Sequence, residues 1–183
     1  MEKYFISAQE LLDDSFKLGE KILKSGFIPN FMVGIWRGGT PVGIAIQEFL
    51  DYNGIQTDHI AIRTSAYVAI DQQARQIQVH GLHYLIDRLN ADDRLLIVDD
   101  VFDSGLSIQA VIGALAERCR RNLPHDIRIA TVFYKPSRNK TNRIPDYHIH
   151  ETDLWLVFPH ELNGLTVEEI RREKPAALHQ NHP

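Results

Sequence analysis

The sequence has little of several features that mark specialised proteins. Among its 183 residues there is one cysteine, Cys119, so no disulfide can form within the chain. No stretch reaches the roughly 20 apolar residues that a membrane-spanning helix needs. Acidic residues occur within the first 16 positions, where a secretory signal would be apolar. We therefore expect a protein of the reducing cytoplasm with no membrane partner.

An excess of basic charge is also missing. The chain has 20 Lys and Arg against 24 Asp and Glu, a formal net charge of -4, and thus no basic surface suited to nucleic acid. The commoner phosphate loops of kinases and dinucleotide enzymes, GxxxxGK[ST] and GxGxxG, are absent from the sequence. If the substrate is polyanionic, a cation must help to bind it.

Apolar strands alternate with amphipathic helices along the chain. Strands are predicted at residues 31–36, 57–63, 95–98, 127–134, 146–151 and 154–158. Helices are predicted at residues 8–25 after a Ser7 capping box, 40–53 with Thr40 as the cap, 79–90, 107–121 and onward from 166. Residues 64–78 have no sustained period, and we expect a mobile loop there. The alternation predicts one α/β domain, with a central parallel sheet flanked by helices.

The most informative segment is LLIVDDVFDSGLS, residues 95–107. Its apolar start predicts a buried strand that delivers Asp99 and Asp100 to the strand's carboxyl end, where open parallel sheets bind ligands. Two adjacent buried acids are costly unless cations or hydroxyl groups meet them. The DSGLS portion then offers a glycine turn, two hydroxyls and a helix start suited to phosphate. These features indicate a site for a phosphorylated sugar.

The same segment closely resembles the phosphoribosyl pyrophosphate signature of the type I phosphoribosyltransferases. The resemblance implies that Asp99 and Asp100 hold the ribose hydroxyls and Mg²⁺, and that Asp103 accepts a proton from purine N7. It implies a 5'-phosphate loop made of Asp103, Ser104, Gly105, Leu106 and Ser107. The resemblance covers roughly residues 30–162. It implies a single domain over residues 1–183, with a core at about 27–136. A hood at about 137–175 would be completed by the N-terminal segment. A buried strand with an acidic capping turn is the plainer alternative.

A second match is WRGGTP, residues 36–41, which is similar to the family's pyrophosphate loop. Glycines let the backbone approach an anion closely, and an arginine gives it a fork of donors. The resemblance assigns pyrophosphate to Arg37, Gly38 and Gly39, with a non-proline cis peptide at Arg37–Gly38. An ordinary strand-to-helix turn with a surface arginine would give the same pattern.

A third match, TVFYKP at residues 131–136, resembles the strand end of the 6-oxopurine enzymes. There Lys135 would reach the oxygen on C6 of the base, and Trp155 would stack on the purine beside Leu156. A solvated lysine and a packed tryptophan are the plainer alternatives. Asp99 stands where many hypoxanthine-guanine enzymes have glutamate, which is more like the xanthine-guanine branch.

These matches together predict a purine salvage phosphoribosyltransferase. It would convert hypoxanthine, guanine or xanthine and phosphoribosyl pyrophosphate to a nucleoside 5'-monophosphate and pyrophosphate, and relatives lead us to expect a homodimer or homotetramer. A catalytically silent nucleotide sensor and a transferase for another base remain alternatives. Other polar residues are weaker candidates for a functional role. We expect His148 and His150 to be ordinary histidines and Cys119 to be packed, whereas Arg138 could border the pyrophosphate site or a subunit contact.

Overall fold

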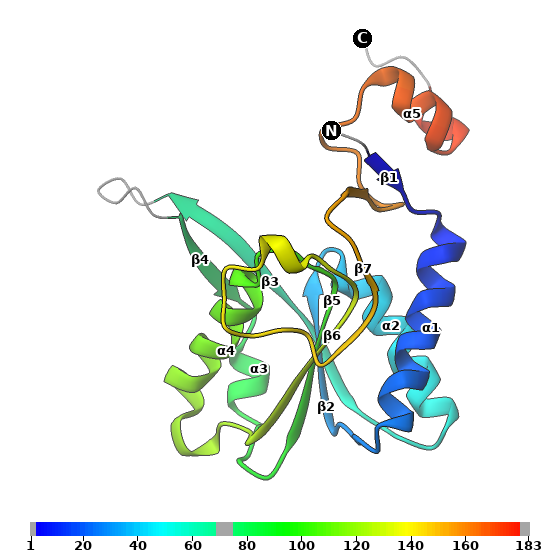
Figure 1. Ribbon diagram of the computed structural model, residues 1–183. Coiled ribbons are helices and arrows are strands. Elements are labelled where there is room, and N and C mark those ends of the chain that lie inside the picture. Colours follow the sequence, from blue (N-terminus) through cyan, green and yellow to red (C-terminus); the bar gives the residue numbers. More distant parts are fainter. Residues whose placement is uncertain (1–2, 69–74, 180–183) are drawn as a thin grey trace.

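The computed structural model describes residues 3–68 and 75–179, which form a six-stranded sheet with helices on both faces (Figure 1). Neighbours in the order β4-β3-β2-β5-β6-β7 pair in parallel, except for the antiparallel pair β3 and β4. The strands of this sheet are β2 (Phe31–Trp36), β3 (Asp58–Val68), β4 (Arg75–His80), β5 (Arg94–Phe102), β6 (Asp126–Tyr134) and β7 (Tyr147–Glu151). The predicted α/β fold with a central, mostly parallel sheet is confirmed.

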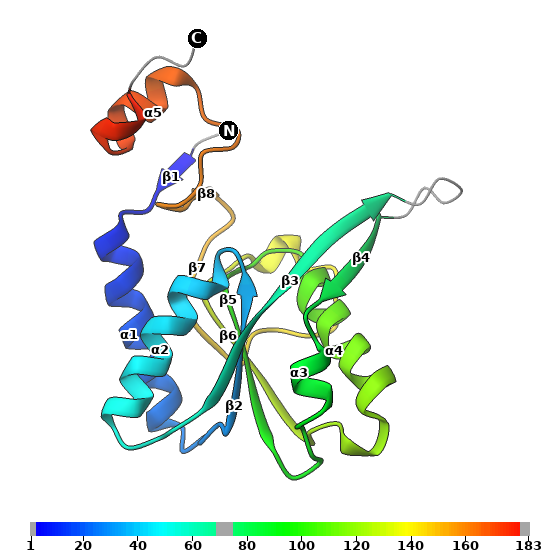
Figure 2. The same cartoon turned by 180° about the vertical axis from the view of Figure 1, so that it is seen from behind.

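Helices cover the two faces of the sheet in pairs, α1 with α2 and α3 with α4 (Figure 2). Their bounds are α1 (Ala8–Lys24), α2 (Gly39–Tyr52), α3 (His83–Ile86) and α4 (Leu106–Cys119). Along β5, Leu96 and Val98 pack into the core on one face, and Leu95 and Ile97 into the core on the other. A strand buried on both faces needs a continuous apolar run, which is why this strand was readable from the sequence. Among the described residues, no helix has both the length and the apolar character to cross a membrane.

The first long helix begins as the capping pattern predicts. The Ser7 hydroxyl accepts a hydrogen bond from the Glu10 backbone N–H at 3.1 Å, and the Glu10 carboxylate accepts one from the Ser7 N–H at 3.4 Å. This reciprocal pair satisfies two backbone donors that the helix start would otherwise leave open. The predicted start of the second helix, with Thr40 as its cap, is wrong in detail. The helix α2 begins at Gly39, after Gly38. The Thr40 N–H already donates to the Arg37 carbonyl at 3.1 Å, so the turn closes earlier.

The structure corrects the prediction of a loop at residues 64–78 and a helix at 79–90. β3 continues to Val68 and pairs with β4, while the helical turn of α3 covers only His83–Ile86. Within β4, residues 76–80, QIQVH, alternate polar and apolar side chains, which suits an edge strand better than a loop. Gly81, at a φ of +88°, then separates this strand from the helical turn. Residues 69–74 of the expected loop lie outside the described residues.

A small second sheet lies beyond the carboxyl ends of the parallel strands (Figure 1). It pairs β1 (Lys3–Phe5) with β8 (Trp155–Val157) in parallel, so two segments that are far apart in the sequence lie side by side. A short helix, α5 (Val167–Glu173), follows with a capping box at Thr166. The main sheet itself continues past residue 136, because β7 pairs with β6.

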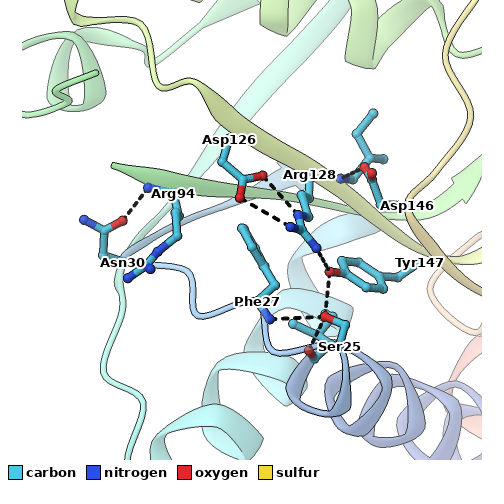
Figure 3. Close-up of polar contacts among 10 residues, drawn as sticks. Ser25, Phe27, Asn30, Arg94, Asp126, Arg128, Asp146 and Tyr147 are labelled. Carbon is cyan, nitrogen blue, oxygen red and sulfur yellow. Dashed lines mark hydrogen bonds and ion pairs between the residues drawn. The ribbon is translucent and has the colours of Figure 1, made fainter. Parts of the chain in front are cut away.

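At the opposite end of the sheet, a polar cluster joins the end of α1 to the starts of β6 and β7 (Figure 3). The Arg128 guanidinium donates to the Asp126 carboxylate at 3.0 Å and to the Tyr147 hydroxyl at 2.7 Å, and it lies 4.4 Å from the centre of the Phe27 ring. The Tyr147 hydroxyl also shares a hydrogen bond of 2.8 Å with Ser25. These contacts fix α1 at the end of the sheet that is remote from the site described below.

A buried carboxylate holds the other half of α1 against β7. Asp14 is 3% exposed and accepts hydrogen bonds from Lys17 at 2.8 Å and from the His150 ring at 2.6 Å. Burial alone would raise the pKa of Asp14, but the hydrogen bonds from Lys17 and His150 outweigh it and lower the pKa. Ionised Asp14 therefore stabilises the fold.

Replacing Asp14 with asparagine should lower the free energy of unfolding near pH 7 by about 1–3 kcal/mol, because two charge-assisted hydrogen bonds are weakened. A carboxyl with a lowered folded pKa contributes stability above its unfolded pKa of about 3.9, and loses it as the pH falls through the folded value. The difference between the two proteins in urea unfolding should therefore shrink below about pH 4. Glu20→Gln, which breaks only the exposed pair with Lys24, is the control and should cost less than about 1 kcal/mol. Equal losses in both variants would contradict this account of Asp14.

Candidate active site

Two adjacent carboxylates lie near the carboxyl end of β5, the central strand that is buried on both faces. Asp99 and Asp100 are followed by Val101 and Phe102, which still pair with β6, so the acids belong to the strand itself. The Asp99 carboxylate accepts a hydrogen bond from the Asp100 N–H at 3.0 Å, and the Asp100 carboxylate accepts one from the Val101 N–H at 2.8 Å. The backbone thus orients both side chains where the sequence predicted an acid pair.

The electrostatics of this pair favour a bound cation. Burial, followed by the negative charge of Asp100, raises the pKa of Asp99 well above its usual range. Two carboxylates together with substrate oxygens are the ligand set that Mg²⁺ prefers when it binds with a phosphorylated substrate. The described residues contain no group of three or more His, Cys, Asp or Glu side chains arranged for a metal. The acid pair therefore fits a metal ion that shares its coordination with a substrate, and does not fit a closed protein cage.

The glycine loop after β2 packs directly on the acids. A Cβ atom on Gly38 would lie 1.8 Å from an Asp100 carboxylate oxygen, and one on Gly39 would lie 2.4 Å from the Val98 carbonyl oxygen. Any side chain at either position would displace the loop or the strand, so this close approach explains both glycines. Arg37 is exposed at the edge of the loop. The non-proline cis peptide of this loop is Trp36–Arg37, one bond earlier than the resemblance implied.

The predicted phosphate loop forms the start of α4. Gly105 has a φ of +75°, and a Cβ there would lie 2.6 Å from the Phe102 ring and 2.8 Å from the Thr141 hydroxyl. Only glycine adopts this conformation in this space without strain. The helix begins at Leu106, one residue earlier than predicted, and the first backbone N–H groups of a helix have no partner within it.

A cavity of about 210 Å³ joins the acid pair to this loop. Its lining contains the acids and most of the predicted phosphate site: Asp99, Asp100, Val101, Phe102, Asp103, Ser104, Gly105, Ser107 and Ile108. Leu106, which the sequence also assigned to the phosphate site, does not line it, but its backbone N–H lies 3.4 Å from the Ser104 hydroxyl. Carboxylates at one side and helix N–H groups at the other match the two ends of a phosphorylated sugar.

Asp103 lies between two cationic side chains. One carboxylate oxygen is 3.4 Å from Lys135 Nζ and the other is 2.7 Å from Arg138 Nε. Lys135 is 5% exposed although it is a lysine, and it follows the end of β6 as predicted. Sequence reasoning left Arg138 undecided between the pyrophosphate site and a subunit contact. Arg138 ends the short 3₁₀ turn Pro136–Arg138, which brings its side chain to Asp103. The sequence pattern did not predict this turn.

A larger cavity, of about 440 Å³, opens on the other side of Asp103 towards the small sheet. It is lined by Val101, Asp103, Lys135, Arg138, Asp153, Trp155, Leu156, Phe158, Glu161 and Asn163. The Trp155 side chain is 43% exposed, while Leu156 is buried. Lys3 lies with its Nζ 5.4 Å from the centre of the Trp155 ring. The structure thus brings Lys135, Trp155 and Leu156 to one cavity beside Asp103.

One contact at this site was missed entirely. His160 Nε2, from the turn after β8, lies 3.6 Å from an Asp100 carboxylate oxygen. The sequence LVFPHE gave no signal for it, because the partners are 60 residues apart and meet only in the folded chain. His148 and His150, in contrast, lie on β7 and contact Glu151 and Asp14, as ordinary partly exposed histidines do. Cys119 is buried at the end of α4, as predicted, and burial raises the pKa of its thiol.

The comparison with family models decides what this arrangement belongs to. The model of the phosphoribosyl transferase domain matches residues 7–163, which include both cavities and all the predicted site residues. The chain belongs to the phosphoribosyltransferase family. A search of curated protein sequences finds no match.

Solved structures with this phosphoribosyltransferase fold include several purine enzymes. A purine phosphoribosyltransferase from Pyrococcus horikoshii has 26% sequence identity and a TM-score of 0.71 over 91% of this chain and 99% of its own. A hypothetical protein from Neisseria gonorrhoeae with bound ppGpp has 20% identity and a TM-score of 0.72, covering 94% of this chain and 95% of its own. The Helicobacter pylori xanthine-guanine-hypoxanthine phosphoribosyltransferase has 19% identity and a TM-score of 0.64, covering 93% of this chain and 99% of its own.

Replacing Asp99 with asparagine should stabilise the ligand-free protein near neutral pH. A carboxyl whose folded pKa is raised costs stability as the pH rises from its unfolded pKa of about 3.9 through the folded value. The variant lacks this penalty, so its advantage in urea unfolding should grow from about pH 4 upward, by about 1.4 kcal/mol for each unit of pKa difference. Asp92→Asn, at an exposed aspartate, is the matched control. A variant no more stable than the control near pH 7 would contradict the strained acid pair.

Proposed function

We propose that this chain is a Mg²⁺-dependent 6-oxopurine phosphoribosyltransferase. It would join hypoxanthine, or guanine or xanthine, to phosphoribosyl pyrophosphate and release a nucleoside 5'-monophosphate and pyrophosphate. The observation that carries the proposal is the 3.4 Å pair of Lys135 and Asp103 at the boundary between the two cavities. In a 6-oxopurine the C6 oxygen and N7 are neighbours on one edge of the ring. A paired donor and acceptor, one for each atom, is the chemistry that this edge requires.

The sugar would lie in the smaller cavity. Its 5'-phosphate would take the helix start at residues 103–107, where N–H groups and hydroxyls favour an anion. Its ribose hydroxyls would face Asp99 and Asp100, which would also hold Mg²⁺. When bound there, Mg²⁺ would neutralise charge on the departing pyrophosphate. Arg37 with the Gly38 and Gly39 backbone would bind that pyrophosphate.

The chemical step is a displacement at the anomeric carbon. The bond to pyrophosphate breaks, a bond from the purine N9 forms, and positive charge develops on the sugar between the two events. The carboxylates of Asp99 and Asp100 would stabilise this charge. Asp103 would take the proton from N7 as the base attacks. Lys135 would hold the C6 oxygen, and Trp155, with Leu156 beside it, would stack on the ring.

The proposal is tested by pyrophosphate release from phosphoribosyl pyrophosphate and Mg²⁺. Hypoxanthine, guanine, xanthine, adenine, uracil and orotate would be offered separately. Release with one or more of the first three is the expected result, and it would name the substrate. Release with adenine or a pyrimidine alone would replace the base assignment. Tight phosphoribosyl pyrophosphate binding with no release for any base would support a catalytically silent nucleotide sensor on the same fold.

Replacing Asp103 with asparagine should separate binding from chemistry. Loss of a general base typically lowers turnover by about 10² to 10⁴-fold. Binding of phosphoribosyl pyrophosphate, measured by calorimetry, should change little, because the helix start and the acid pair remain. Ser137→Ala, in the adjacent 3₁₀ turn, is the control for local disturbance. Normal turnover in Asp103→Asn would remove the base assignment.

A further inference from the structure

The turn at residues 158–161, which follows β8, is held from the C-terminal part of the chain. Lys174 Nζ donates hydrogen bonds to the Phe158 carbonyl at 2.7 Å and to the Pro159 carbonyl at 3.3 Å. Its own carbonyl oxygen lies 2.8 Å from the His179 ring nitrogen. The segment after α5 therefore reaches back and captures two successive carbonyl groups of one turn.

This capture is an unusual use of a lysine. Lys174 is 8% exposed, and burial lowers the pKa of its amine. An ammonium group gains nothing from burial by itself, and hydrogen bonds to carbonyl oxygens are what compensate it. The two hydrogen bonds therefore hold the Lys174 amine and the turn in place relative to each other.

The turn in question carries His160 to the acid pair. Its backbone closes through a hydrogen bond from the Glu161 N–H to the Phe158 carbonyl at 3.0 Å. The His160 ring stacks on the Phe158 ring, with centroids 5.7 Å apart and planes 14° apart. From there its Nε2 lies 3.6 Å from Asp100 Oδ2, an ion-pair distance longer than a hydrogen bond.

Asp100 is confined on its other sides. The backbone of Gly38 packs against the same oxygen, since a Cβ there would lie 1.8 Å from it, and the Val101 N–H occupies the other oxygen at 2.8 Å. The Asp99 carboxyl also lies against it, and among the ion pairs of the described residues His160 is its one basic partner. It closes the group from the side of the small sheet.

We propose that Lys174 and His160 act as one positioning device for Asp100. Lys174 fixes the turn, the turn fixes the His160 ring on Phe158, and the ring holds the Asp100 carboxylate in the orientation in which it meets the ribose and Mg²⁺. This inference rests on the proposed function. It assigns to residues far from the signature segment an effect on the sugar side of the site, while Trp155 and Leu156 in the same small sheet serve the base side.

The test compares ligand affinities of variants by calorimetry, which requires no turnover. His160→Phe keeps a ring to stack on Phe158 but removes the nitrogen, and Lys174→Met keeps the aliphatic stem but removes the amine. Each should weaken Mg²⁺-dependent binding of phosphoribosyl pyrophosphate by about 10-fold, the size of one lost polar contact. His160→Gln, which keeps an N–H donor, should restore most of the affinity lost in His160→Phe.

The double variant decides whether the two residues act together. If Lys174 acts through His160, the combined variant should bind about 10-fold more weakly than the wild type, and not the roughly 100-fold expected of independent sites. Lys3→Met is the matched control: it removes the amine that bonds Glu169 and lies over Trp155, so it loosens the same small sheet from the base side. It should raise the KM for the purine base in the pyrophosphate-release assay and leave phosphoribosyl pyrophosphate affinity, measured by calorimetry, unchanged.

Several results would overturn the inference. One is unchanged phosphoribosyl pyrophosphate affinity in both single variants, and another is full additivity in the double variant. Equal losses for sugar and base in Lys174→Met would make the lysine a general brace of the small sheet. If Lys174→Met does not fold, His160→Phe and its rescue by glutamine still decide the role of the ring. A wild-type protein that binds no phosphoribosyl pyrophosphate would sink the proposed function as well, whereas wild-type binding with unaffected variants would sink this inference alone.

Discussion

The contact between the glycine loop and the acid pair is the constraint on which the rest of the site depends. Gly38 and Gly39 bring the backbone after β2 against Val98 and Asp100 of β5, closer than any side chain would allow. This contact places the loop that is predicted to bind pyrophosphate beside two carboxylates about 60 residues away in the sequence. The two halves of the predicted sugar site, one suited to pyrophosphate and one to ribose, therefore share a single rigid boundary. Because protein interiors are packed as densely as organic crystals, a shift of the loop would also displace the strand.

The adjacent carboxyls of Asp99 and Asp100 form an unfavourable electrostatic arrangement. Asp99 is partly buried next to Asp100, and desolvation together with the charge of Asp100 raises its pKa. Sites in which local stability is given up commonly mark function, because the missing interaction is supplied by a ligand. Here the missing interaction is positive charge. That requirement agrees with the net charge of -4, since the chain itself has no cationic surplus to offer a polyanion.

Local patterns carried the prediction of most of the site, and contacts between distant segments limited it. β5, the Gly105 turn and the start of α4 follow one another in the sequence, so spacing alone identified them. The β3–β4 pair was missed because RQIQVH is short and follows a stretch of mostly polar or small residues with no sustained period. The contacts of His160 with Asp100 and of Arg138 with Asp103 could not be predicted for another reason. The turns that carry these two side chains have no distinctive residues, and only the folded chain brings the partners together.

The pairing of β1 with β8 ties the first few residues to the side chain that we propose stacks on the base. Lys3 is in register with Trp155, and its amine lies 5.4 Å from the centre of that ring while also bonding Glu169. The surroundings of the Trp155 ring are thus built from two segments that are far apart in the sequence. Fusion partners, affinity tags or trimming near residue 3 would alter the surroundings of this ring, so differently tagged forms of the protein would differ in the cavity that the ring lines.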